Sequence, residues 1–120
     1  SPLFGNWNGL PPLLFHAGST EMLLDDSVRA HDRARQAGVE AEIEVWLDMP
    51  HVFHVFSWVP EAKAGVRAVA DFIRDRSMRR PANETRNLLE STVRVREYAG
   101  AGLEDVPAAG KFMEFGTHAR

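Results

Sequence analysis

The chain has 120 residues, of which 44% are hydrophobic and 26% charged, and these values are typical of one small globular domain. Its net charge of −3 gives no electrostatic reason to expect binding to nucleic acid. Cysteine is absent, which excludes disulfides and thiolate zinc sites, and we expect a reducing compartment, the cytoplasm. No apolar run approaches the ~20 residues that a membrane-spanning helix needs.

The first third of the chain predicts a loop, a buried strand and a helix. Residues 1–12 are rich in Pro, Gly and Asn, which is typical of an entry loop. Residues 13–17 are mostly apolar and Gly18 ends the run, which indicates a strand buried on both faces, as in a parallel sheet. Residues 23–37 have helical spacing of apolar side chains, with acidic residues in the first turn.

A second strand and a second helix follow. Along residues 41–47, the aliphatic residues at odd positions alternate with Glu42, Glu44 and Trp46, which predicts a strand. Glu42 and Glu44 share one of its faces, and we interpret that face as solvated or as belonging to a protected sheet edge. Pro60 opens a helix in which apolar residues recur at helical spacing through Arg76.

The predicted order is strand, helix, strand, helix, which favours an α/β fold with two parallel strands joined by a right-handed helical crossover. Two strands alone are only marginally stable. We therefore expect the free edge of the first strand to be covered by the rest of a larger sheet or by a second copy of the chain.

Residues 77–120 have a different character. Asn83 is positioned to cap a third helix that would run to about Tyr98, although residues 93–96 alternate and leave a strand open as the alternative. Several glycines and Pro107 then predict loop or disorder. The sequence thus predicts a mostly helical or irregular extension, for which we consider a role in oligomerisation.

Two polar groups with acid–base chemistry follow the two predicted strands. Glu21 comes shortly after the first strand and His51 shortly after the second. Because functional groups in parallel sheets gather at the carboxyl ends of the strands, we expect both at one edge. A carboxylate beside an imidazole can form the acid–base part of a nucleophilic triad. The alternatives are a helix-start glutamate and an ordinary loop histidine.

Three motifs carry a resemblance to a known family. They are Gly9-Leu10-Pro11-Pro12-Leu13-Leu14, Gly18-Ser19-Thr20-Glu21-Met22-Leu23-Leu24-Asp25-Asp26 and Asp48-Met49-Pro50-His51-Val52-Phe53. Together they resemble the C-terminal part of hormone-sensitive-lipase-like α/β-hydrolases over residues 1–76. The resemblance implies a partial α/β-hydrolase fold in this segment.

The resemblance also implies a function. It places the acid of a catalytic triad on Glu21, where many members have Asp, and the triad histidine on His51. It further implies hydrolysis of small acyl esters without a metal or an organic cofactor. Phe53, Phe56 and Trp58 would line an acyl pocket in the complete enzyme, or would pack the loop onto the core.

The departures from the family concern the nucleophile. Neither an oxyanion-hole His-Gly-Gly nor a Gly-x-Ser-x-Gly elbow occurs in the chain, so we expect no activity from the chain alone. We interpret it as a fragment of a serine carboxylesterase or lipase that needs its N-terminal half. The alternative is a non-catalytic remnant that forms homo-oligomers or binds a partner. His51 and His54 are too few to predict a metal site. We interpret His16 as a core histidine and expect His31 at the surface.

Overall fold

The computed structural model describes residues 2–78, 93–99 and 102–106. The elements in chain order are η1 (Pro2–Phe4), β1 (Leu13–Gly18), α1 (Leu24–Gln36), β2 (Ala41–Trp46), η2 (Phe53–Val55), α2 (Pro60–Met78), β3 (Val93–Ala99) and β4 (Gly102–Val106). The predicted order of strand, helix, strand and helix over the first 76 residues is therefore confirmed.

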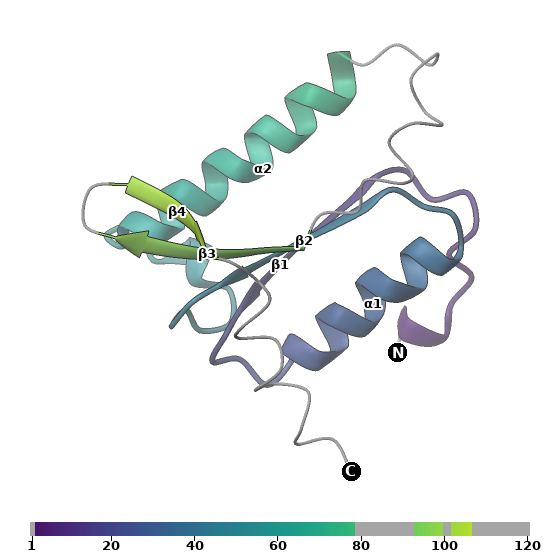
Figure 1. The fold of residues 1–120 in the computed structure, drawn as a ribbon, viewed down its shortest axis with the longest axis horizontal. Coiled ribbons are helices and arrows are strands. Elements are labelled where there is room, and N and C mark those ends of the chain that lie inside the picture. Colours follow the sequence, from purple (N-terminus) through teal and green to yellow (C-terminus); the bar gives the residue numbers. More distant parts are fainter. Residues whose placement is uncertain (1, 79–92, 100–101, 107–120) are drawn as a thin grey trace.

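The sheet has four strands in the order β1-β2-β3-β4 (Figure 1). β1 and β2 are parallel neighbours, with Leu13 opposite Ala41 and Gly18 opposite Trp46. β2 and β3 are also parallel, whereas β3 and β4 are antiparallel. The parallel β1–β2 pair brings the carboxyl ends of these two strands to one edge of the sheet, as expected.

Helix α1 covers one face of the sheet, and α2 lies on the other side (Figure 1). Ala17, Ile43 and Val45 pack beneath α1 against Leu24. His31 of α1 is only 1% exposed and makes an edge-to-face contact with Phe15, so the expectation that it lies on the surface is wrong. Apolar packing on this face therefore holds the two parallel strands against α1.

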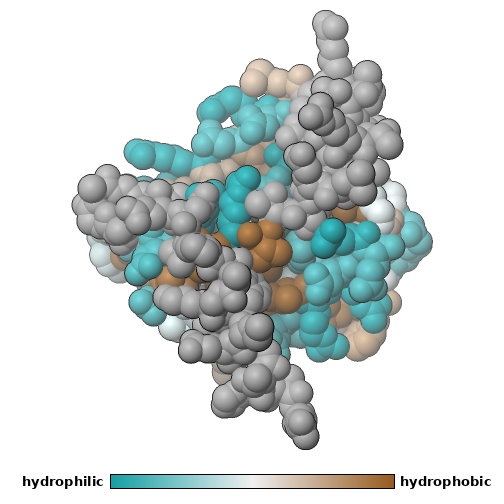
Figure 2. All heavy atoms as spheres, in the orientation of Figure 1, coloured by the Kyte–Doolittle hydropathy of each residue, from teal (hydrophilic) through white to brown (hydrophobic). Residues whose placement is uncertain are grey.

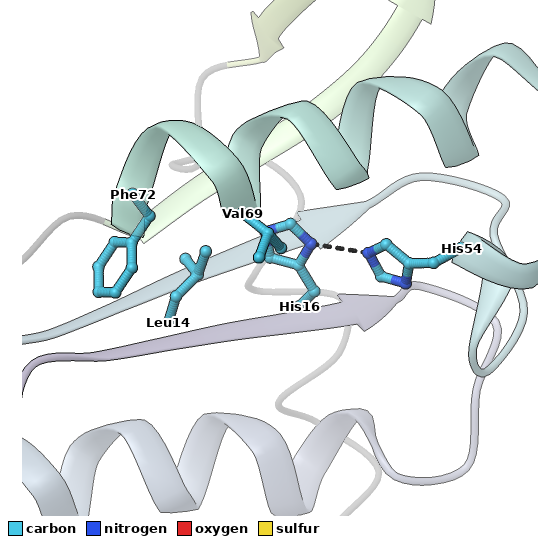
Figure 3. Close-up of a pocket in the computed structure, with 5 residues that line it drawn as sticks. All are labelled: Leu14, His16, His54, Val69 and Phe72. Atoms are coloured by element: carbon cyan, nitrogen blue, oxygen red, sulfur yellow. Dashed lines mark hydrogen bonds between the residues drawn. The ribbon is translucent and has the colours of Figure 1, made fainter. Parts of the chain in front are cut away.

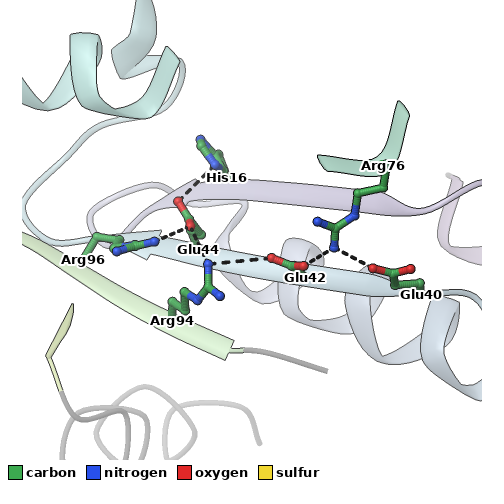
Figure 4. Close-up of polar contacts among 7 residues, drawn as sticks. All are labelled: His16, Glu40, Glu42, Glu44, Arg76, Arg94 and Arg96. Atoms are coloured by element: carbon green, nitrogen blue, oxygen red, sulfur yellow. Dashed lines mark hydrogen bonds and ion pairs between the residues drawn. The ribbon is translucent and has the colours of Figure 1, made fainter. Parts of the chain in front are cut away.

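The face towards α2 is polar and yet covered, which corrects the interpretation of the two glutamates. Glu44 is 3% exposed and Glu42 is half-buried, and both lie on an inner strand of the sheet. Arg76 of α2 and the arginines of β3 neutralise them (Figure 4). A buried carboxylate is tolerated only when such partners are present.

The extension departs from the helix that we predicted to about Tyr98. Residues 93–99 form β3, so the strand alternative for residues 93–96 is correct, and residues 102–106 form β4 rather than a loop. Residues 79–92, which include Asn83, and residues 107–120 lie outside the described residues. Without β3, the outer edge of β2 would present unpaired backbone N–H and C=O groups, and β3 forms hydrogen bonds with them. The spacing of apolar residues along the chain could not reveal this pairing.

β1 has no strand partner on its outer side among the described residues. Several apolar side chains of the described residues are also exposed, among them Val66, Val69 and Ile73 on one stripe of α2. Figure 2 shows apolar side chains reaching the surface between hydrophilic ones on one face of the molecule. Across the described ranges, no helix has both the length and the apolar character needed to cross a membrane.

Candidate active site at the carboxyl edge of the sheet

Hydrogen bonds join the loop that follows β1 to the loop that follows β2. Asp48 donates its backbone N–H to Ser19 Oγ at 2.9 Å, and the Thr20 hydroxyl donates to the Met49 carbonyl at 2.9 Å. The Ser19 backbone N–H donates to the Trp46 carbonyl at 2.9 Å. These bonds fix the loop that bears Glu21 relative to the loop that bears His51.

Gly18 permits the close approach of the two loops. A Cβ atom at this position would lie 1.9 Å from the Met49 carbonyl oxygen and 2.6 Å from its carbonyl carbon. Both are backbone atoms, which cannot rotate away as a side chain can. A glycine at this position is therefore required by the packing of the site itself.

Glu21 and His51 face each other at this edge. Glu21 Oε2 lies 3.4 Å from His51 Nδ1, and the same oxygen accepts the Gly18 backbone N–H at 3.1 Å. The Glu21 side chain is 5% exposed and that of His51 is 60% exposed. A buried carboxylate thus supports an imidazole whose other nitrogen is open to a reactant.

The contact fixes which ring nitrogen is available for chemistry. A carboxylate at Nδ1 favours the tautomer with its hydrogen on Nδ1, so Nε2 carries the lone pair. Nε2 of His51 has no hydrogen-bond partner among the described residues. At 3.4 Å the contact is longer than a strong hydrogen bond.

The His51 loop holds backbone in a rarely occupied conformation. Asp48 and Val52 have φ angles of 56° and 54°, in the left-handed region that non-glycine residues seldom adopt. For the β-branched Val52 such a conformation costs on the order of 1–3 kcal/mol. These residues lie on either side of His51, and backbone strain of this kind gathers at functional sites.

The three aromatic residues assigned to an acyl pocket lie in different surroundings. Phe53 is 1% exposed and packs against Trp46 and Ala62 in the core. Phe56 is half-buried, and its ring lies 5.4 Å from that of Trp58, which is 75% exposed. The structure therefore places one ring in the core and two at the surface, and a role in acyl binding stays a prediction.

His54 does not join His51 in a metal site. Its Nε2 lies 2.9 Å from Nδ1 of His16, which belongs to β1 (Figure 3). Within the described ranges, no three His, Asp or Glu side chains are grouped so that they could hold a metal ion. His16 and His54 line a pocket of about 340 Å³, together with Leu14, Val69 and Phe72.

Comparison with known proteins identifies the N-terminal part of the chain. Residues 1–55 match the model of a family described as having the alpha/beta hydrolase fold. An esterase of Acinetobacter venetianus is 44% identical over 73 residues, which are 60% of this chain and 24% of that protein. An acetyl-hydrolase of Streptomyces hygroscopicus is 37% identical over 78 residues, which are 62% of this chain and 25% of that protein.

Solved structures agree with these sequences. An esterase/lipase from an uncultured bacterium has 45% identity and a TM-score of 0.62, covering 63% of this chain and 26% of its own. An esterase of the bacterial hormone-sensitive lipase family gives the same values. The first part of this chain is a portion of a hormone-sensitive-lipase-like α/β-hydrolase. The chain spans about a quarter of the length of these relatives.

The hydrolase portion contains its acid and histidine candidates where the sequence placed them, but sequence reasoning missed the groups beside them. The sequence did not predict the network of polar contacts that joins His16, Glu44 and Arg96. A signal for it existed, because Glu42 and Glu44 share one period-two face and Arg94 and Arg96 share another. Only the pairing of β2 with β3 shows that these faces meet.

Proposed function

We propose that this chain provides the acid and the general base of a serine carboxylic-ester hydrolase. The observation that carries the proposal is the contact between buried Glu21 and exposed His51 at the carboxyl edge of two parallel strands. In this proposal, a serine outside these 120 residues attacks the ester carbonyl, and His51 Nε2 takes its proton. His51 then gives the proton to the leaving alcohol, and Glu21 stabilises the imidazolium.

The names of the relatives support an ester as the substrate. These relatives are named an esterase, an acetyl-hydrolase and a carboxylesterase/phospholipase, and carboxylic esters are common to these names. Among such esters we propose small acyl esters. The half-buried ring of Phe56 and the exposed ring of Trp58 lie on the same loop as His51 and are our candidates for contact with the acyl chain. No metal or organic cofactor is needed for this reaction, because the nucleophile and the proton both come from side chains.

The proposal is tested by transferring the site into a complete enzyme. Residues 1–76 replace the matching segment of an esterase that is 45% identical, and hydrolysis of p-nitrophenyl butyrate is measured. We expect an active chimera that loses roughly 10³- to 10⁶-fold in kcat on His51→Ala and ~10⁴-fold on Glu21→Gln. His31→Gln on the far face is the matched control and should retain kcat.

The 120-residue chain alone serves as a second control. It contains no Gly-x-Ser-x-Gly elbow, and we expect no turnover above that of buffer. Turnover by this chain that disappears with His51→Ala would contradict the expectation that the nucleophile lies outside these residues. A folded chimera that keeps full activity as the His51→Ala variant would refute the role of His51.

A second candidate function is that of a non-catalytic module that binds its own copy. The outer edge of β1, which lacks a strand partner within the described part of the chain, favours it, because an unpaired strand is a template for pairing with another chain. The exposed apolar stripe of α2 adds to this surface. We expect sedimentation at micromolar concentration to give a dimer or a larger assembly. A well-folded monomer under these conditions would contradict this second function.

A further inference from the structure

A buried line of polar groups connects the interior of the sheet to the His51 loop. His16 Nε2 lies 3.2 Å from Glu44 Oε2, and Arg96 donates to Glu44 Oε1 at 2.8 Å (Figure 4). The other nitrogen of His16 meets His54 Nε2 at 2.9 Å (Figure 3). The side chains of His16 and Glu44 are 6% and 4% exposed, so solvent scarcely screens these contacts.

His54 anchors the far end of the loop that carries His51. It lies in η2, three residues after His51, and its ring is held between β1 and α2. A Cβ atom on Gly65 of α2 would lie 2.9 Å from His54 Nε2 and 3.1 Å from the Phe53 ring. A glycine inside a helix costs roughly 1 kcal/mol, and here it lets α2 approach His54 closely.

The contact between the two imidazoles depends on the number of protons that they hold. Arg96 favours an ionised Glu44, and a carboxylate 3.2 Å from His16 Nε2 favours a hydrogen on that nitrogen of the ring. The nitrogens that face each other then share one hydrogen, whether the pair is neutral or carries one positive charge. With two positive charges, two N–H groups face each other and the contact cannot persist.

We propose that His16 and His54 position the His51 loop by sharing one hydrogen, and that a second proton on this pair releases the loop. The geometry makes His54 a positioning residue, because it acts on His51 through the backbone of residues 52–54. As far as it concerns catalysis, this inference rests on the proposed function. Its direct consequence, a loop whose stability depends on pH, does not.

The surrounding charges allow the pair to take up one proton and oppose a second. The described groups that face the pair are Glu44 of β2, with Arg94 and Arg96 of β3 on its far side. From α2 the pocket is lined by the apolar side chains of Val69 and Phe72, and Arg76 of the same helix is held by Glu40 and Glu42. Burial and the charge of His16 lower the pKa of His54, which agrees with this assignment.

Amide hydrogen exchange of the 120-residue chain tests the proposal. The Val55 and Phe56 amides donate within η2 at 3.0 Å each, and their protection factors report whether the loop is closed. We expect these factors to fall about tenfold per pH unit as the pH falls from 6.5, the ordinary pKa of His54, towards its lowered value in the closed loop. The Val39 amide, bonded to Ala34 on the α1 side, is the internal control and should stay protected.

Two substitutions at the same position separate sharing of a hydrogen from simple packing. In His54→Gln the side-chain amide can donate to His16 Nδ1 and does not titrate, so protection should persist at low pH. In His54→Phe the donor is lost, and we expect low protection at every pH. Protection in the wild type that is independent of pH, or a Gln variant that opens like the wild type, would overturn the inference. An inactive chimera with a normally closing loop would contradict the proposed function alone.

Discussion

Glu44→Gln is expected to lower the free energy of unfolding by roughly 3 kcal/mol at neutral pH. The substitution keeps the size and shape of the side chain but removes the charge that compensates Arg96. Because Arg96 and Glu44 are largely buried, the guanidinium then loses this counter-charge at a site that solvent screens poorly. Removal of one partner from a buried ion pair is costly for this reason, even when the intact pair contributes little.

The pH dependence gives this prediction a second signature. Burial raises the pKa of Glu44, but contacts with His16 and Arg96 outweigh it and lower the pKa to about 2, from an ordinary 4.5. A carboxyl group with a lowered pKa contributes stability above pH 4.5, and this contribution is lost as the pH falls towards 2. The wild type should therefore lose its advantage over Glu44→Gln within this window.

Urea unfolding at a series of pH values measures both effects. Asp75→Asn is the matched control, because it also removes one negative charge but from an exposed position on α2. We expect this control to change the free energy of unfolding by less than ~0.5 kcal/mol. A Glu44→Gln protein as stable as the wild type at neutral pH would show that the charged network contributes no net stability.

Gly18→Ala is expected to have the second large effect, because the new methyl group would overlap with backbone. It would lie 1.9 Å from the Met49 carbonyl oxygen and 2.9 Å from that of Pro50. The loop must move away, and overpacking of this kind costs about 1–3 kcal/mol. Since His51 follows Pro50 directly, we expect the contact between Glu21 and His51 to open as well.

Two measurements check this prediction. Thermal or urea unfolding of the chain should show the loss of stability, and in the chimera described above kcat should fall about 10²-fold, as expected for a shift of ~1 Å. Gly5→Ala is the matched control, since its Cβ would meet a single atom, the Pro2 carbonyl oxygen, at 3.2 Å. Retention of both stability and kcat in Gly18→Ala would refute the role assigned to the close approach.

Local patterns were sufficient for much of the hydrolase portion. The alternation of residues 41–47 and the helical spacing of residues 23–37 gave elements whose bounds agree with β2 and α1 within a few residues. The order of elements predicted that the two strands are parallel neighbours, and this arrangement predicted that Glu21 and His51 lie at one edge of the sheet. Both features are present in the structure. These features could be predicted because the periodicity of side chains follows directly from backbone geometry.

Other features could not be predicted because they depend on which elements pack against a given face of a strand or helix. Alternation showed that Glu42 and Glu44 share a face but not that α2 and β3 bury it. His31 lies on the apolar stripe of α1 with Leu24, yet a polar ring was expected at the surface. For residues 93–98 the helical interpretation was wrong, since pairing with β2 favours a strand whatever the local preference.

The sequence by itself determined the elements of the first 76 residues, the parallel crossover and the two side chains at its carboxyl edge. Each of these depends on neighbours along the chain or on a rule of connection between consecutive elements. Only the tertiary structure decided that β3 extends the sheet and that His16 joins Glu44 to His54. Such contacts join residues far apart in the chain, and their energies depend on burial, which no local pattern contains.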